Sequence, residues 1–234
     1  MYRALATYYD RLMADVPYGD WVDFAVRFLP EGSGVDLACG TGSFTLALAQ
    51  RGRRVTGVDS SADMLRFACE KALTRGLRTT FVQSDMTAFS CRPVDFVTCV
   101  CDGINYIEQP ADVFVRVYEM LVPGGVFLFD VSSAYKLRNT LGNHTFFYDD
   151  GDLVYMWRNF PHKTYLDIDL TFFAREGDLW RRSDESQRQF LHSELALTEA
   201  LHAAGFTVQT FGGYAMRPVG KNEERVCFVC RRAG

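Results

Sequence analysis

The sequence predicts an α/β protein in which a mostly parallel sheet carries helices on both faces and an antiparallel β meander is inserted. The stretch Val35–Asp59 reads as a strand, a glycine turn, a helix and a second strand. Apolar strand-like segments then alternate with helical segments as far as residue 131, as expected of a parallel sheet with helical crossovers. Residues 132–190 break this alternation, because runs with period-two patterning are joined there by short polar turns.

The segment before the first strand is predicted to be helical. Apolar residues recur at helical spacing over residues 5–13, Pro17 interrupts the pattern, and Trp21–Leu29 forms a second amphipathic helix. In the unit that follows, Gly40 and Gly42 make a turn in which the missing Cβ atoms let a ligand approach the backbone. This turn is therefore the first candidate for a binding site.

A carboxylate closes the same unit. Ser43 can cap the helix Phe44–Gln50, and the second strand Arg54–Val58 leads directly to Asp59. The carboxyl end of a strand is where open α/β sheets bind ligands, and an acid there can bind both hydroxyls of a ribose. A dinucleotide site would need a small third residue after the two glycines, but Thr45 stands at that position. An oxidoreductase that binds a dinucleotide is therefore a disfavoured alternative.

The remaining elements follow from the same signals. They divide the chain into a main domain, residues 1–131 with 191–234, and an inserted antiparallel β subdomain, residues 132–190. In the main domain we expect helices over 62–75, 111–121 and 193–204, and strands over 79–83, 94–100, 126–131, 206–211 and 225–232. In the insertion we expect a short helix over 135–141 and strands over 145–148, 154–160, 165–174 and 179–190.

One motif points to a particular family. The run Asp36-Leu37-Ala38-Cys39-Gly40-Thr41-Gly42 resembles motif I of the class I S-adenosylmethionine-dependent methyltransferases, and Cys101-Asp102-Gly103-Ile104-Asn105-Tyr106 is similar to a loop of poorly characterised bacterial small-molecule methyltransferases. The resemblance covers roughly the first half of the chain well and the closing helix and strands loosely. It implies a Rossmann-like seven-stranded sheet of order 3-2-1-4-5-7-6. It also implies methyl transfer to a small-molecule acceptor by in-line displacement, catalysed mainly by proximity and orientation, with S-adenosylhomocysteine as product.

The resemblance implies how the cofactor S-adenosylmethionine is bound. The glycine turn would lie against its methionine part, Asp59 would hold the ribose, and Asp85 would accept the adenine amino group. The N-terminal segment would fold over the cofactor as a lid. The implied cofactor-binding residues are Tyr9, Trp21, Asp36, Ala38, Gly40, Gly42, Asp59, Ser60, Met64, Asp85, Met86 and Cys101.

The resemblance says less about which residues bind the methyl acceptor. Asp102 and Asn105 would either orient the acceptor or only satisfy the backbone of their loop, and Tyr135 and Trp157 are weaker candidates in the insertion, which would form an acceptor pocket or a dimer surface. Histidine is a frequent general base, but a histidine without an assigned role is usually a surface residue or a hydrogen-bonded core residue. We therefore assign no catalytic residue. No metal is expected, because Asp102 and Asp130 lack companion Asn or His residues.

The composition of the chain disfavours some classes of binding partner. The net charge of −4 provides no overall basic field, so nucleic acid is a disfavoured partner and an RNA or protein methyltransferase is a weaker alternative. No apolar run approaches the ~20 residues of a membrane helix. The seven cysteines are odd in number and lie mostly in apolar runs, which predicts reduced thiols in a cytoplasmic protein. A homodimer through the β insertion and a cofactor-binding protein without catalysis stay open.

Overall fold

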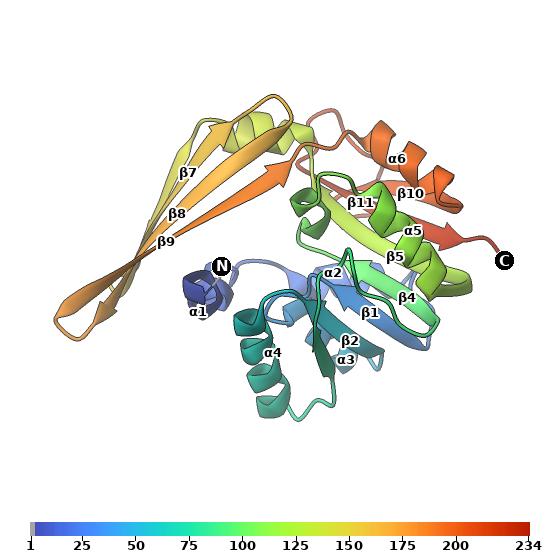
Figure 1. Cartoon of the computed structure of the whole chain (residues 1–234), viewed down its shortest axis with the longest axis horizontal. Helices are drawn as coiled ribbons and strands as arrows, with labels where there is room; N and C mark the ends of the chain where they lie inside the picture. The colour runs from blue at the N-terminus through green and yellow to red at the C-terminus, as the bar shows by residue number, and fades with distance from the viewer. Residues whose placement is uncertain (1–2) are drawn as a thin grey trace.

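The computed structural model describes residues 3–234 and contains a seven-stranded and a four-stranded sheet (Figure 1). The large sheet has the order β10-β11-β5-β4-β1-β2-β3. Its strands β1 to β5 are parallel to their neighbours, whereas β11 runs antiparallel to both β5 and β10. Because β10 and β11 are the sixth and seventh strands of the main domain, this confirms the predicted order 3-2-1-4-5-7-6.

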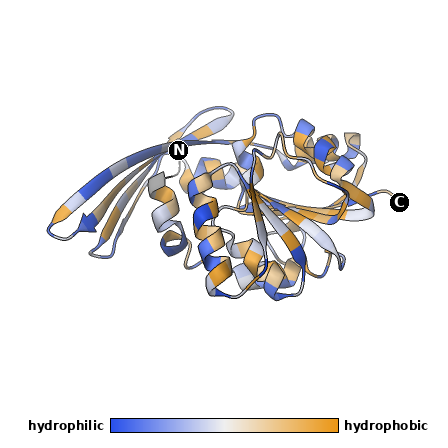
Figure 2. Cartoon of the chain, turned by 60° about the horizontal axis from the view of Figure 1, so that its bottom comes forward, coloured by the Kyte–Doolittle hydropathy of each residue, from blue (hydrophilic) through white to orange (hydrophobic). Residues whose placement is uncertain are grey.

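The strands of the large sheet agree with the predicted segments to within a few residues, except at β5. They are β1 (Ser33–Leu37), β2 (Arg54–Asp59), β3 (Thr80–Gln83), β4 (Val94–Cys99), β5 (Leu121–Ser132), β10 (Phe206–Gly212) and β11 (Arg225–Arg232). Strand β5 begins five residues before the predicted Val126, because Leu121 already pairs with Val94 of β4 and a register shift follows. The central strands are almost fully buried and mostly hydrophobic (Figure 2).

Helices cover both faces of this sheet. They are α1 (Arg3–Leu12), α2 (Tyr18–Ala25), α3 (Ser43–Gln50), α4 (Ala62–Thr74), α5 (Ala111–Met120) and α6 (Glu194–Ala203). Buried side chains of α2 and α3 pack on one face of the sheet, and those of α5 and α6 pack on the other. Helix α2 begins at Tyr18 rather than at the predicted Trp21, because Pro17 directly precedes it and proline suits the start of a helix. No helix within residues 3–234 combines the length and the apolar character needed to cross a membrane.

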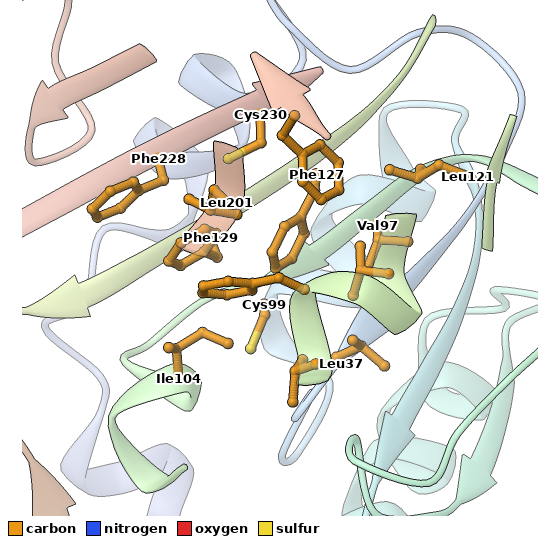
Figure 3. Packing of buried hydrophobic residues seen from close by; sticks show 14 of the residues in the cluster. Leu37, Val97, Cys99, Ile104, Leu121, Phe127, Phe129, Leu201, Phe228 and Cys230 are labelled. Carbon is orange, nitrogen blue, oxygen red and sulfur yellow. The ribbon is translucent and has the colours of Figure 1, made fainter. Parts of the chain in front are cut away.

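Stacked phenylalanines form the centre of the core beside α6 (Figure 3). Phe129 of β5 stacks on Phe228 of β11 with ring centroids 4.7 Å apart, and Phe127 lies 4.8 Å from Phe129. All three side chains are fully buried. Offset stacking adds about 0.5–1.5 kcal/mol per pair to the burial of the rings. This packing fixes the antiparallel β11 against β5.

The predicted meander is present as a separate antiparallel sheet. It comprises β6 (Thr145–Asp149), β7 (Leu153–Pro161), β8 (Tyr165–Glu176) and β9 (Leu179–Phe190), in that order. Alternate residues of β8, such as Ile168 and Phe172, are buried in one cluster with Leu5 of α1 and Met64 of α4. Helix α1 therefore lies between the meander and the large sheet (Figure 1). Two short helical turns, Gly103–Tyr106 after β4 and Lys136–Leu141 after β5, complete the chain.

Candidate functional site

A cavity of about 550 Å³ lies at the carboxyl ends of the parallel strands. Ala38 follows β1, Asp59 ends β2, Asp85 follows β3 and Cys101 follows β4, and all four residues line the cavity. The carboxyl ends of parallel strands lie at one edge of the sheet, which brings these distant segments together. Helix α1 and the inner face of the meander supply the other walls.

The two glycines of the turn serve different purposes. Gly40 lines the cavity with φ of +55°, and a Cβ built on it would meet only the Tyr9 ring, at 3.9 Å. Gly42 has φ of +75°, and its Cβ would lie 3.0 Å from Ala68 and 3.1 Å from the ring of Phe81. Gly40 therefore leaves space for a ligand, whereas Gly42 allows the start of α3 to pack closely against α4 and β3.

Asp59 connects the glycine turn to the end of β2. Its Oδ2 accepts the backbone N–H of Gly40 and its Oδ1 accepts that of Ser61, both at 2.8 Å. Burial raises the pKa of Asp59, although these N–H groups favour its charged form. A carboxylate offers about four lone-pair sites, so it retains acceptor capacity for a ligand.

Asp36 is fully buried and does not contact the cavity. It accepts hydrogen bonds from the hydroxyls of Thr45 at 2.5 Å and Thr98 at 2.7 Å. Burial raises the pKa of Asp36 to about 6, even though both hydroxyls favour the carboxylate. Asp36 thus holds β1 to α3 and β4 behind the glycine turn. Thr45, which departs from the dinucleotide pattern, is one of its two partners.

Within residues 3–234, three residues other than glycine have a left-handed backbone, and all three line the cavity. They are Ala38, Cys101 and Asp102, with φ of 52°, 58° and 55°. Such conformations cost of order 1–3 kcal/mol each and cluster at functional sites. The backbone N–H of Asp102 is held by Asp130 Oδ1 at 2.6 Å. The strained turn after β4 therefore fixes the position of Asp102 in the cavity wall.

Buried charges surround Asp102. Arg225 of β11 contacts Asp102 Oδ1 at 2.9 Å and Asp130 Oδ2 at 2.5 Å, and Gln189 of β9 donates to Asp102 Oδ2 at 2.7 Å. Burial disfavours the charged form of Asp102, but the nearby charges of Arg225 and Lys136 outweigh it and hold the pKa of Asp102 below its usual range. Asp102 is therefore a fixed anion at this end of the cavity.

Helix α1 forms part of the cavity wall and is held on two sides. Asp10 accepts Lys71 Nζ of α4 at 2.8 Å and the hydroxyl of Thr41, in the glycine turn, at 2.6 Å. On the other side, Arg11 pairs with Asp150 of the meander. Tyr9, which directly precedes these anchors, lines the cavity together with apolar residues of the same segment. The segment therefore forms one wall of the cavity.

The structure brings most of the expected site residues together. Those that line the cavity are Tyr9, Ala38, Gly40, Asp59, Ser60, Met64, Asp85, Met86, Cys101, Asp102 and Trp157. Within the described chain, the lining does not include Trp21, Asp36, Gly42, Asn105 or Tyr135.

Besides Asp36, which is held by Thr45 and Thr98, two of these five residues have clear structural partners elsewhere. The Trp21 ring stacks on Tyr214 at 4.5 Å between centroids, so it packs on the connection between β10 and β11. The Asn105 amide bonds the backbone of Ser132 and of Phe190, which is the loop-satisfying alternative that the sequence left open.

Sequence reasoning missed several polar residues of the lining. They are Tyr106, Lys136, Gln187, Gln189 and Arg225. The two glutamines could have been predicted to face the cavity from their pairing in the meander. Gln189 and Gln187 of β9 pair with the buried Leu166 and Ile168 of β8. Directly paired residues of an antiparallel sheet share a face. For Arg225, nothing in the local sequence indicates a buried ion pair.

Comparisons with known proteins agree with this geometry. Residues 35–125 match a family model described as a methyltransferase domain. The Bacillus subtilis protein named "Putative methyltransferase YqeM" is 36% identical over 215 residues, which cover 88% of this chain and 86% of that protein. The crystal structure of an S-adenosylmethionine-dependent methyltransferase from Clostridium acetobutylicum is 32% identical, with a TM-score of 0.90, 100% of this chain covered and 99% of that one. CalS10 of Micromonospora echinaspora, an amino pentose methyltransferase solved with S-adenosylmethionine bound, shares the fold at 17% identity, with a TM-score of 0.75 and coverage of 94% and 93%.

Proposed function

Because this chain belongs to the class I S-adenosylmethionine-dependent methyltransferases, we propose that it methylates a small-molecule acceptor held between the large sheet and the meander. The observation that carries the proposal is one cavity lined by two chemically different groups of residues. Residues at the ends of strands β1 to β4 are one group, which we call the cofactor end, and Asp102, Gln189 and Arg225 are the other, which we call the acceptor end. Cofactor and acceptor can therefore be enclosed together.

The strand-end residues fit S-adenosylmethionine. Gly40 leaves open space beside the turn, and Asp59 has lone pairs left for the two ribose hydroxyls. Asp85 lines the cavity, and its Oδ1 caps the following turn by accepting hydrogen bonds from the hydroxyl and the backbone N–H of Thr87. Its Oδ2 can therefore accept a hydrogen bond from the adenine amino group. Met64 lines the same end and offers an apolar surface to the adenine ring.

When bound, S-adenosylmethionine supplies a sulfonium methyl carbon that is open to in-line displacement. The chain's own contribution is orientation and the exclusion of water. Helix α1 covers the cavity, and correct placement of two reactants can supply about 7–11 kcal/mol of the barrier. Asp102 orients the acceptor rather than taking its proton, because its low pKa makes it a weak base.

Two features support a small acceptor rather than RNA or protein. Helix α1 is anchored over the cavity by Asp10 and Arg11, so the site is covered rather than presented on a flat surface. The net charge of −4 also disfavours a nucleic acid partner. In this proposal residues 132–190 act as an acceptor-pocket subdomain, because Trp157 and Gln187 of the meander line the cavity. A homodimer and a cytoplasmic location stay predictions.

The test is a transfer experiment with radioactive methyl groups. The protein is incubated with [methyl-³H]S-adenosylmethionine and a bacterial extract separated into small-metabolite, RNA and protein fractions. We expect label in the small-metabolite fraction with the wild type and with the surface control Asp112→Asn. Label confined to RNA or to protein would overturn the proposal.

Asp59→Asn should abolish this labelling. Two charge-assisted hydrogen bonds to a ribose contribute at least about 3 kcal/mol, which corresponds to about a hundredfold in affinity. Calorimetric titration with S-adenosylhomocysteine measures this loss directly. An Asp59→Asn protein that binds S-adenosylhomocysteine as tightly as the wild type would show that this carboxylate does not hold the ribose.

A further inference from the structure

A chain of hydrogen bonds crosses the acceptor end of the cavity. It begins at Asp102, whose Oδ2 accepts from Gln189 Nε2 at 2.7 Å. The same Nε2 donates to the phenolic oxygen of Tyr106 at 3.2 Å, and the Tyr106 hydroxyl donates to Gln187 Oε1 at 3.0 Å. The two glutamine amides therefore meet at a single phenol, although they belong to different positions of β9.

The partly buried ion pair between Arg225 and Asp102 fixes the direction of every bond in this chain. Arg225 keeps Asp102 ionised, and a carboxylate can only accept hydrogen bonds. The Gln189 amide must therefore turn its NH₂ toward Asp102, which sets its Oε1 on the other side. Because Tyr106 accepts from this NH₂, its own proton goes to Gln187. The Gln187 amide is thereby fixed with its Nε2 away from Tyr106.

This order leaves one acceptor and one donor without a partner. Within residues 3–234, Gln189 Oε1 and Gln187 Nε2 are buried and make no hydrogen bond. Gln189 is only 5% exposed, and both residues line the cavity. Buried polar groups without partners are rare and call for an explanation. Both unpaired atoms are explained if a ligand in the cavity supplies the missing donor and acceptor.

The wall beside the glutamines is apolar. Trp157 already donates its indole N–H to Asn159 at 2.6 Å, so its ring offers only an apolar surface. Tyr155 and the β8 residues Ile168 and Leu170 continue this surface along the cavity. Sites of this kind, with few polar groups on a mostly apolar lining, fix the orientation of a compact ligand.

We propose that Gln187 and Gln189 are specificity-determining residues that bind two neighbouring hydroxyls of a sugar-like, polyhydroxylated ring acceptor. A hydroxyl can both donate and accept, so one hydroxyl donates to Gln189 Oε1 and the next accepts from Gln187 Nε2. The ring itself packs against Trp157. This inference rests on the proposed function and names the acceptor class of the same site.

The test compares ring probes with and without hydroxyls on protein saturated with S-adenosylhomocysteine. The hydroxylated probes are D-glucose, D-glucosamine and myo-inositol, and the matched rings are cyclohexanol and cyclohexylamine. Saturation-transfer NMR detects binding, and titration gives the Kd of each probe. The variant Gln187→Glu keeps the oxygen that faces Tyr106 but replaces the free donor with an acceptor. Gln209→Glu, on the exposed face of β10, is the matched control.

We expect at least one hydroxylated probe to bind the wild type at least tenfold more tightly than the matched rings. Gln187→Glu should remove this preference and Gln209→Glu should keep it, while S-adenosylhomocysteine affinity stays unchanged in both. The inference is overturned if no hydroxylated probe binds, if the rings bind alike, or if Gln187→Glu leaves the preference intact. Failure of S-adenosylhomocysteine to bind the wild type would instead refute the proposed function on which the inference rests.

Discussion

Asp36 offers a direct test of how the buried side of the motif works. Its carboxyl is fully buried between Thr45 and Thr98, and burial raises its pKa from 3.8 to about 6. In the unfolded chain the group ionises near its ordinary pKa. Between these two values the unfolded state loses its proton while the folded state keeps it, so the folded state becomes relatively less stable as pH rises. Stability from this group is complete below pH 3.8 and lost as the pH passes 6.

The magnitude follows from the shift. A difference of about two pKa units corresponds to about 3 kcal/mol, most of which is lost between pH 4 and pH 7. Asp36→Asn has the same shape and no such titration. Urea unfolding of both proteins across this range isolates the contribution, because all other groups cancel in the difference. We expect the wild type to lose about 2–3 kcal/mol relative to Asp36→Asn as pH rises. A constant difference, or a relative gain by the wild type, would show that the two threonine hydroxyls outweigh burial.

Two further predictions concern the lid and the core. Asp10→Asn weakens the contact of α1 with Lys71, so S-adenosylhomocysteine should dissociate several-fold faster in stopped-flow measurements. The control Asp15→Asn changes an exposed residue and should not alter the dissociation rate. Equal rates for Asp10→Asn and the wild type would show that this contact does not hold the lid. Gly34→Ala should destabilise the protein by about 1–3 kcal/mol in urea unfolding, because its Cβ would lie 2.1 Å from the Phe96 ring. Gly19→Ala, with no atom within 4 Å, should cost nothing, and equal stabilities would contradict this packing.

The cofactor end was predictable because its residues follow from local patterns. Asp59 ends β2 and Asp85 lies two residues after β3, and parallel strands place their carboxyl ends at one edge whatever the rest of the chain does. The strand order also follows from the family resemblance. Asp36 was placed in the motif by its spacing, but its burial behind the turn depends on Thr98, a residue of another strand.

The acceptor end was harder to predict because it is built from contacts between distant segments. Trp21 was expected at the cofactor, yet its ring stacks on Tyr214, almost two hundred residues away. Gln187 reaches the cavity only because the meander folds back beside the turn that carries Tyr106. Such contacts depend on how two sheets are placed, which periodicity within a segment does not specify.

The ion pairs of Arg225 with Asp102 and Asp130 link β11 to the loop that follows β4 and to β5. Every strand-end residue of the cofactor end lies before residue 102, but the guanidinium that neutralises Asp102 and Asp130 enters with the last strand. Without β11, these two carboxylates would lie close together with only Lys136 as a nearby positive charge, an arrangement that opposes their burial. The charge balance of the acceptor end therefore depends on the pairing of β11 with β5, which places Arg225 between the two carboxylates.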